Sequence, residues 1–326
     1  MSPRKSLIFS VPQLFPFLTS SQEGGELPIL TTVISKANQY TFERQNNNLG
    51  LFSFFSKIKP DFGDCHAALE LYALGNCLDS WVCYAEPVLM QPNREHLSLS
   101  RADGFELNKE EANSFCIELN DYFKAYNLEF SFIAPNRWIC CAKKGFDVSK
   151  YAPQLMLGAN VLRYSPQDAD NLLWRKISNE SQMLLHHSTT NQKRILNGKP
   201  EFNSLWFWGG GTLPATYQSD FECVLSNSNE ILGLAKLGKA KTRRLDSESD
   251  INDLVINDSS CVYLDLLQID EKERLIEDYL KTFIDFLKNE KISELVLIPD
   301  FDKKFVLKAN DLNKFWRIRK SVSKYL

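Results

Sequence analysis

The segment "EFNSLWFWGGGTLP", residues 201–214, contains residue types that could hold a ligand. An apolar run with two tryptophans leads into three consecutive glycines, Gly209, Gly210 and Gly211, and Pro214 follows them. The apolar run predicts a strand with both faces buried, and the glycines predict a turn. Because no side chain covers such a turn, its backbone N–H groups can approach a phosphate or carboxylate. It can equally be a corner without a ligand, so both interpretations stay open here.

Two further pairs of residues could carry chemistry. Cys65 and His66 suggest a nucleophile beside a base. Neighbouring residues on a helix point in different directions, however, so this pair is poorly placed for catalysis. Cys140 and Cys141 lie in an expected strand, where cysteines are more typical of a core than of a redox pair.

The cysteine and histidine content is informative about cofactors and compartment. The eight cysteines form no C-x-x-C pair, which in a chain of 326 residues predicts reduced thiols and a cytoplasmic protein. The chain contains only four histidines: His66, His96, His186 and His187. A pair of hard metal sites needs several converging carboxylates and imidazoles. The sequence therefore predicts no metal and no cofactor.

The elements that must position these residues alternate between strand and helix at both ends of the chain. Strands are expected at 6–11, 261–267 and 293–299, and amphipathic helices at 108–127, 167–188 and 270–290. Such alternation predicts an α/β fold with a mostly parallel sheet flanked by helices. We expect a core domain from residues 1–100 and 201–326, with an α+β insertion domain at 101–200.

Bulk properties exclude some classes of partner. The net charge is −3, which argues against a general nucleic-acid binder, and no apolar run reaches the roughly 18 residues of a membrane span. One alternative remains open. The basic segment 303–326 contains interleaved aromatic residues, which could contact single-stranded nucleic acid or an acidic partner.

The order of segments resembles the archaeal-type cofactor-independent phosphoglycerate mutases of the alkaline phosphatase superfamily. It resembles more closely still the bacterial RpfE-type regulatory proteins, which are similar to those mutases. The parallels run nearly the whole length, at 27–38, 135–141, 186–214 and 229–239, and the segment 186–214 is the most specific match. This resemblance implies an alkaline-phosphatase-like sheet with an insertion domain.

The departures from the mutase pattern concern its catalytic residues. Gln13 stands where the resemblance implies a metal aspartate, and Asp64 stands about where it implies the serine that is phosphorylated. Asp300 is kept, but Phe301 replaces the histidine that should follow it. The resemblance therefore implies a protein without catalytic residues, so the assignment as an enzyme is uncertain and leans towards no.

Residues of the mutase substrate region are kept, and they correspond to Arg137, Asn191, Arg194 and Asn203. Guanidinium groups bind phosphate and carboxylate bidentately, so two converging arginines would make an anion site between core and insertion. The glycines at 209–211 complete this candidate ligand site. Alternatively, the asparagines brace the connection before the tryptophan strand, and Arg194 pairs with a glutamate at 180 or 201.

Three functions follow from these observations. The leading one is a non-catalytic binding or regulatory protein, which binds a small phosphorylated or carboxylated anion or a protein partner. The second is an active metal-dependent phosphoglycerate mutase or phosphatase. The third is a nucleic-acid-associated protein that uses its basic C-terminal segment.

Overall fold

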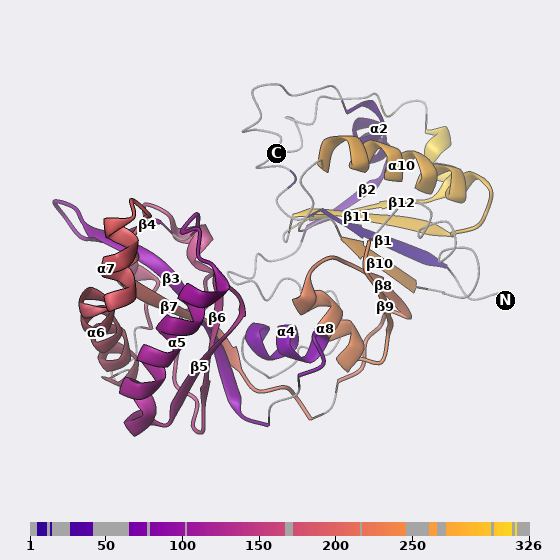
Figure 1. Ribbon diagram of the computed structural model, residues 1–326. Coiled ribbons are helices and arrows are strands. Elements are labelled where there is room, and N and C mark those ends of the chain that lie inside the picture. The colour runs from indigo at the N-terminus through magenta and orange to yellow at the C-terminus, as the bar shows by residue number, and fades with distance from the viewer. Residues whose placement is uncertain are drawn as a thin grey trace. The chain divides into compact units, whose positions relative to one another are not determined.

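The computed structural model, shown in Figure 1, divides the chain into two compact units. Unit 1 combines residues 1–60 with 216–326, and unit 2 is the continuous segment 61–215. The structure describes residues 5–11, 14, 27–41, 65–76, 79–101, 103–166, 172–215, 217–245, 261–265, 272–300, 303–314 and 317.

Unit 1 contains a seven-stranded sheet in the order β2-β12-β11-β1-β10-β8-β9. Its strands are β1 (Ser6–Ser10), β2 (Asn38–Thr41), β8 (Cys223–Leu225), β9 (Lys241–Arg243), β10 (Cys261–Asp265), β11 (Glu294–Asp300) and β12 (Lys303–Leu307). The pairs from β11 through β1, β10 and β8 to β9 are parallel, whereas β11 with β12 and β12 with β2 are antiparallel. This sheet is therefore mixed.

The core of unit 1 forms around the central strand β1. Leu7 and Phe9 are fully buried, and the Phe9 ring meets Phe283 edge-on with their centroids 5.4 Å apart. Phe283 belongs to α10 (Lys272–Lys288), whose Glu277 carboxylate accepts hydrogen bonds from the first backbone N–H groups of α2 (Pro28–Lys36). This contact satisfies donors that a helix start otherwise leaves unpaired. Unit 1 also contains α8 (Asn229–Leu237) and a short 3₁₀ helix at Ala309–Asn313.

Unit 2 contains a five-stranded sheet in which every pairing is antiparallel. Its strands are β3 (Trp81–Pro92), β4 (Leu97–Arg101), β5 (Leu128–Ala134), β6 (Arg137–Ala142) and β7 (Ser204–Gly211). The order is β4-β3-β6-β5, and β7 pairs with the long strand β3. The helices are α4 (His66–Ala73), α5 (Lys109–Phe123), α6 (Leu172–His187) and α7 (Thr189–Leu196), and 3₁₀ turns cover Lys124–Tyr126, Pro153–Met156 and Val161–Arg163.

The helices α5, α6 and α7 lie side by side along the sheet of unit 2 (Figure 1). Their apolar faces bury Phe115, Leu119 and Ile177 in one cluster with Trp138 and Phe207 of the strands. Asn108 begins α5 with a capping box, in which its side chain accepts from Glu111 N and its own N–H donates to the Glu111 carboxylate. The sequence therefore fixes where α5 starts.

The structure corrects the predicted sheet. A mostly parallel sheet is wrong, because one sheet is mixed and the other is antiparallel throughout. The prediction rested on the alternation of strands and helices at both ends of the chain, whereas the apolar run before the glycines predicted only a strand with both faces covered. In β7 this cover comes from α4 and α6, which both contact the strand. The strands expected at 6–11 and 293–299 in the core domain do fall in one sheet, where β1 and β11 are neighbours.

One further prediction differs from the structure. The glycines at 209–211 were expected in a turn, but they form the end of β7. The insertion expected at 101–200 lies within unit 2, which runs from 61 to 215 and includes β3, β4 and β7, and its boundaries stay a prediction. The expected helices at 108–127, 167–188 and 270–290 correspond to α5, α6 and α10.

Candidate functional site

All the predicted ligand-binding residues belong to unit 2, where the two arginines lie in separate polar clusters. The Arg137 cluster consists of Glu70, Tyr84, Glu86, Arg137 and Gln154. The Arg194 cluster consists of Phe105, Glu111, Arg194, Lys199 and Pro200.

In the Arg137 cluster, one guanidinium is shared by two buried carboxylates. Arg137 Nε donates to Glu70 Oε2 at 2.9 Å, and its Nη1 donates to Glu86 Oε1 at 3.0 Å. The side chains of Glu70 and Glu86 are only 8% and 3% exposed, whereas that of Arg137 is 29% exposed. A carboxylate buried in this way requires a cationic or hydrogen-bonding partner, and Arg137 contacts both of these carboxylates.

Aromatic rings fix the Arg137 guanidinium from the side. Its central carbon lies 4.0 Å from the centroid of the Tyr84 ring and 5.8 Å from that of Trp208. The Tyr84 hydroxyl donates to Glu70 Oε2 at 2.7 Å, so one carboxylate oxygen binds both the phenol and the guanidinium. Gln154 Nε2 donates to Glu86 at 3.4 Å. An anion would have to displace a carboxylate that already has a charge-assisted partner.

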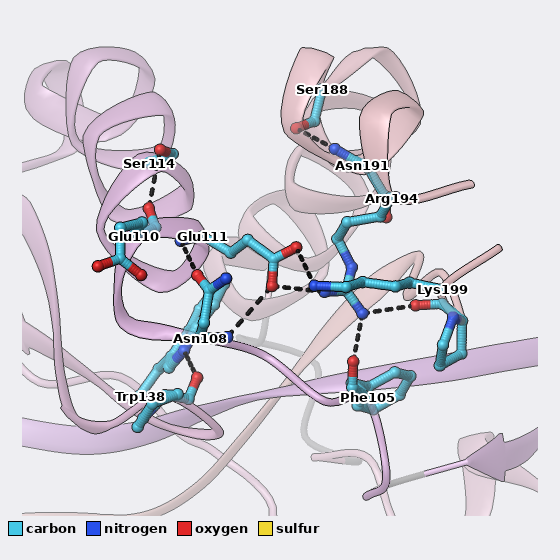
Figure 2. Close-up of polar contacts among 12 residues, drawn as sticks. Phe105, Asn108, Glu110, Glu111, Ser114, Trp138, Ser188, Asn191, Arg194 and Lys199 are labelled. Atoms are coloured by element: carbon cyan, nitrogen blue, oxygen red, sulfur yellow. Dashed lines mark hydrogen bonds and ion pairs between the residues drawn. The ribbon is translucent and has the colours of Figure 1, made fainter. Parts of the chain in front are cut away.

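The Arg194 cluster is more deeply buried, and Figure 2 shows Glu111 between Asn108 and Arg194. Arg194 is 1% exposed, and its Nη1 donates to Glu111 Oε2 at 2.9 Å. Its Nη2 donates to the backbone carbonyls of Phe105 and of Pro200, the latter at 2.8 Å. Lys199 Nζ contacts the other carboxylate oxygen of Glu111 at 3.1 Å. The guanidinium thus joins the start of α5 to the chain that follows α7.

The surroundings of Glu111 lower the pKa of its carboxyl. Burial alone would raise the pKa of its carboxyl, but the Asn108 N–H, the Lys199 ammonium and the Arg194 guanidinium together hold the pKa below its ordinary value. The ionised form is therefore the one that the fold stabilises. The Arg194 Nε atom is buried and has no hydrogen-bond partner within the described residues.

Both asparagines bond to backbone groups. Asn191 Nδ2 donates to the carbonyls of Leu185, at 3.2 Å, and Phe202, at 2.8 Å. Asn203 accepts from Met90 N at 2.9 Å and donates to Met90 O at 2.8 Å. These contacts brace the ends of α6 and β7, as the alternative interpretation of the sequence expected. Ligand binding by either asparagine stays a prediction.

The glycines of β7 allow α4 to approach the strand closely. Gly209 has a φ of +61°, and a Cβ built there would lie 3.0 Å from His66 Cβ. A Cβ on Gly211 would lie 2.8 Å from Cys65 Cβ and 2.9 Å from Cys65 Cα, and one on Gly210 would overlap Trp81. Side chains at these positions would therefore displace α4 or Trp81. This packing explains the glycines without a ligand, and ligand binding by them stays a prediction.

Among the described residues, the two arginines pair with different carboxylates. Glu70 and Glu86 contact Arg137, whereas Glu111 contacts Arg194. Arg194 does pair with a glutamate, as the alternative interpretation expected, but the glutamate is Glu111 rather than Glu180 or Glu201. Glu70 and Glu86 were not among the predicted site residues. A charged residue inside the apolar run "WVCYAEPVLM" was a usable signal for Glu86, because a carboxylate buried in a strand requires a partner.

The mutase-type catalytic positions are only partly covered by the structure. Gln13, Asp64 and Phe301 lie outside the described residues. Within the described part, no three residues of the His, Cys, Asp and Glu types are grouped so that they could hold a metal ion. Cys65 is buried immediately before α4, and the described cysteines form no disulfide with one another. Among the helices that the structure describes, none has the length and apolar character needed to cross a bilayer.

Comparisons with known proteins give structural matches alone. No protein-family model matches the chain, and no curated protein matches it. The PH0037 protein from Pyrococcus horikoshii is similar with a TM-score of 0.56 and 12% identity, over 94% of this chain and 88% of that one. The cofactor-independent phosphoglycerate mutase from Thermoplasma acidophilum is similar with a TM-score of 0.44 and 13% identity, over 94% and 90%. The first match shows a shared fold.

Proposed function

We propose that this chain is a non-catalytic binding or regulatory protein on a phosphoglycerate-mutase-like scaffold, of the kind that the RpfE-type resemblance implies. The proposal rests on one observation about the four residues that the resemblance implies for the mutase substrate region: each of them bonds to groups of the protein itself. Arg137, Asn191, Arg194 and Asn203 all hold protein groups. A substrate site would need at least the arginines to present free donors to an anion.

The sequence at the catalytic positions supports the same proposal. Gln13, Asp64 and Phe301 replace the residues that the resemblance implies for metal binding and phosphoryl transfer. Gln13 has an amide in place of the metal-binding carboxylate, Asp64 lacks the hydroxyl of the serine, and Phe301 lacks the imidazole nitrogen of the histidine.

Activity and metal content test the proposal directly. We expect purified full-length protein to show no interconversion of 3- and 2-phosphoglycerate with Mn²⁺ or Mg²⁺ present, and no stoichiometric metal by mass spectrometry. Turnover above about 1 s⁻¹, within the usual range of enzymes, would favour the mutase instead. The variant Asp300→Ala is the control, since it removes the one metal aspartate that the resemblance retains. Activity that survives this change comes from a contaminant.

Anion binding is proposed for Arg137 alone, because its side chain is 29% exposed whereas Arg194 is 1% exposed. A phosphate or carboxylate would compete there with Glu70 and Glu86, so binding should be weak. The melting temperature of wild type and of Arg137→Ala, measured against rising 3-phosphoglycerate, tests this, since a ligand stabilises only the state it binds. A rise in wild type that Arg137→Ala abolishes supports the site. An unchanged wild type leaves the cluster as a structural brace.

A further inference from the structure

A groove on unit 2 lies between α5 and α6, away from both arginine clusters. We call it the α5–α6 groove, and its volume is about 630 Å³. It is lined by Glu118, Asp121, Tyr122, Met183, Leu184, His187, Ser188 and Thr189.

The floor of the groove is apolar and accessible. Met183 is 64% exposed and Tyr122 is 45% exposed, and Leu184 lies between Met183 and the core residue Leu185. An unbranched thioether and an aromatic ring adapt well to a partner's side chains. A concave apolar surface of this kind is typical of a site that receives a helical segment.

The walls of the groove are held by hydrogen bonds. The hydroxyls of Tyr122 and Tyr126 both donate to Glu180 of α6, which ties the end of α5 to that helix. Thr190 Oγ1 donates to Glu118 at 2.9 Å and so ties α5 to α7. A groove with fixed walls loses little entropy when it is filled, which favours binding.

The negative charge of the groove favours a basic partner. Glu118 and Asp121 contribute two carboxylates, and none of the eight lining residues is a lysine or arginine. Glu180 adds a further carboxylate beside Tyr122. Such a surface repels phosphate-bearing partners, namely nucleic acids and anionic lipid surfaces, and attracts cations.

We propose that the α5–α6 groove docks a basic amphipathic segment of another protein. An apolar side chain of that segment packs on Met183, Leu184 and Tyr122, and flanking lysines or arginines lie near Glu118 and Asp121. This inference goes beyond the proposed function, because neither an absence of catalysis nor an anion at Arg137 requires a partner at this groove.

Two synthetic helical peptides of 15 residues test the proposal, one built from leucine and lysine and the other with glutamate in place of every lysine. Each is labelled and titrated with the full chain, and binding is followed by fluorescence anisotropy. We expect saturable binding of the lysine peptide with a Kd below about 1 mM, and binding of the glutamate peptide at least about tenfold weaker.

Matched variants locate the binding. Met183→Ser should weaken binding of the lysine peptide about tenfold, through loss of buried apolar surface, and Asp121→Asn about threefold. The control is Leu196→Ser, which removes an 86% exposed leucine of α7 outside the lining. It should leave binding unchanged. All three side chains are exposed, and an unchanged melting temperature checks that the fold is intact. Met183→Gln replaces Met183→Ser if that variant fails this check.

Three results would overturn the proposal. In the first, Leu196→Ser weakens binding as much as Met183→Ser does. In the second, both peptides bind equally. In the third, the chain binds phosphatidylglycerol vesicles or a 15-nucleotide single strand but not the lysine peptide. None of these results depends on catalysis or on the anion test, so this inference and the proposed function can fail separately.

Discussion

The two arginine clusters of unit 2 have opposite charge ratios. In the Arg194 cluster, one carboxylate, Glu111, serves two cations, Arg194 and Lys199. In the Arg137 cluster, one guanidinium serves two carboxylates. The first cation is 1% exposed and completes its contacts with backbone carbonyls, whereas the second is 29% exposed and lies against aromatic rings.

The difference in burial and charge ratio gives the two clusters different roles. The Arg194 cluster is a structural brace, whereas the Arg137 cluster is accessible to a competing ligand. Arg194 joins segments that are distant in sequence, and no solvent reaches it to compensate for its loss. Arg137 pairs with two buried carboxylates while its own side chain is partly exposed to water. Residue type alone made the two arginines equivalent, but burial and charge ratio give them different energetic roles.

The largest effect should come from removal of Arg194. Arg194→Ala leaves Glu111 without its buried cation and two carbonyls without a donor, which should cost about 3–5 kcal/mol of unfolding free energy. Urea denaturation measures this cost. The control Lys193→Ala changes the exposed neighbouring cation and should cost less than about 0.5 kcal/mol. Equal effects from the two variants would contradict the role of Arg194 as a brace.

Removal of Arg137 should have the second largest effect. Arg137→Ala leaves the buried carboxylates of Glu70 and Glu86 without their cation. Because water reaches part of the site, we expect a loss of about 2–3 kcal/mol of unfolding free energy. Arg137→Lys should recover only part of this loss, because an ammonium cannot bridge two carboxylates as a planar guanidinium does. Full recovery by lysine would mean that charge alone, without the fork geometry, organises this cluster.

A glycine substitution tests how tightly the Arg137 cluster is packed. Gly209→Ala places a Cβ 3.0 Å from His66 and 3.3 Å from the Tyr84 ring that stacks on Arg137. Gly198→Ala is the matched control, because Gly198 also has a positive φ, of +70°, but no atom lies within 4 Å of its Cβ position. Backbone strain should cost about 1 kcal/mol at both positions, and crowding about 1 kcal/mol more at Gly209. Equal melting temperatures for the two variants would show that α4 moves away easily.

The smallest effect concerns the pH dependence of the Arg194 cluster. Because the fold lowers the pKa of Glu111, the unfolded chain binds more protons there, and stability rises with pH. The contribution of Glu111 is complete above its unfolded pKa of about 4.3 and is lost as the pH falls through the lower folded value. The pH-dependent part of the cost of Glu111→Gln, measured by urea denaturation at each pH, should therefore be present near pH 6 and decrease progressively towards pH 3. The exposed neighbour Glu110, changed to Gln, serves as the control.

Local patterns in the sequence were sufficient for the helices. The amphipathic periodicity of 108–127 and 270–290 predicted α5 and α10, and Asn108 followed by Glu111 carries the N-terminal cap. The direction of the strands was not predictable in this way. β7 pairs with β3 across more than 110 residues of sequence, and no local pattern distinguishes that pairing from a parallel one.

The candidate site shows the same limit. The resemblance to the mutase substrate region implied Arg137 and Arg194, and a glutamate partner was a sound alternative for Arg194. The actual partners lie 67, 51 and 83 residues away from their arginines. Which of the many glutamates is brought near an arginine depends on tertiary packing, so it could not be obtained from spacing. The glycines were misplaced for a similar reason, because the close approach of α4 is also a long-range contact.

The division of the chain into an uninterrupted unit 2 and a divided unit 1 has a consequence during synthesis on the ribosome. Unit 2 is complete once residue 215 has emerged, and it can then fold. Strand β1 is made first of all the strands, but its two neighbours, β10 and β11, end at Asp265 and Asp300. At about 5–20 residues per second, the 85 residues from 215 to 300 take roughly 4–17 s. Throughout that interval the apolar side chains of β1 lack their neighbouring strands, so nascent unit 1 exposes apolar surface for longer than unit 2 does.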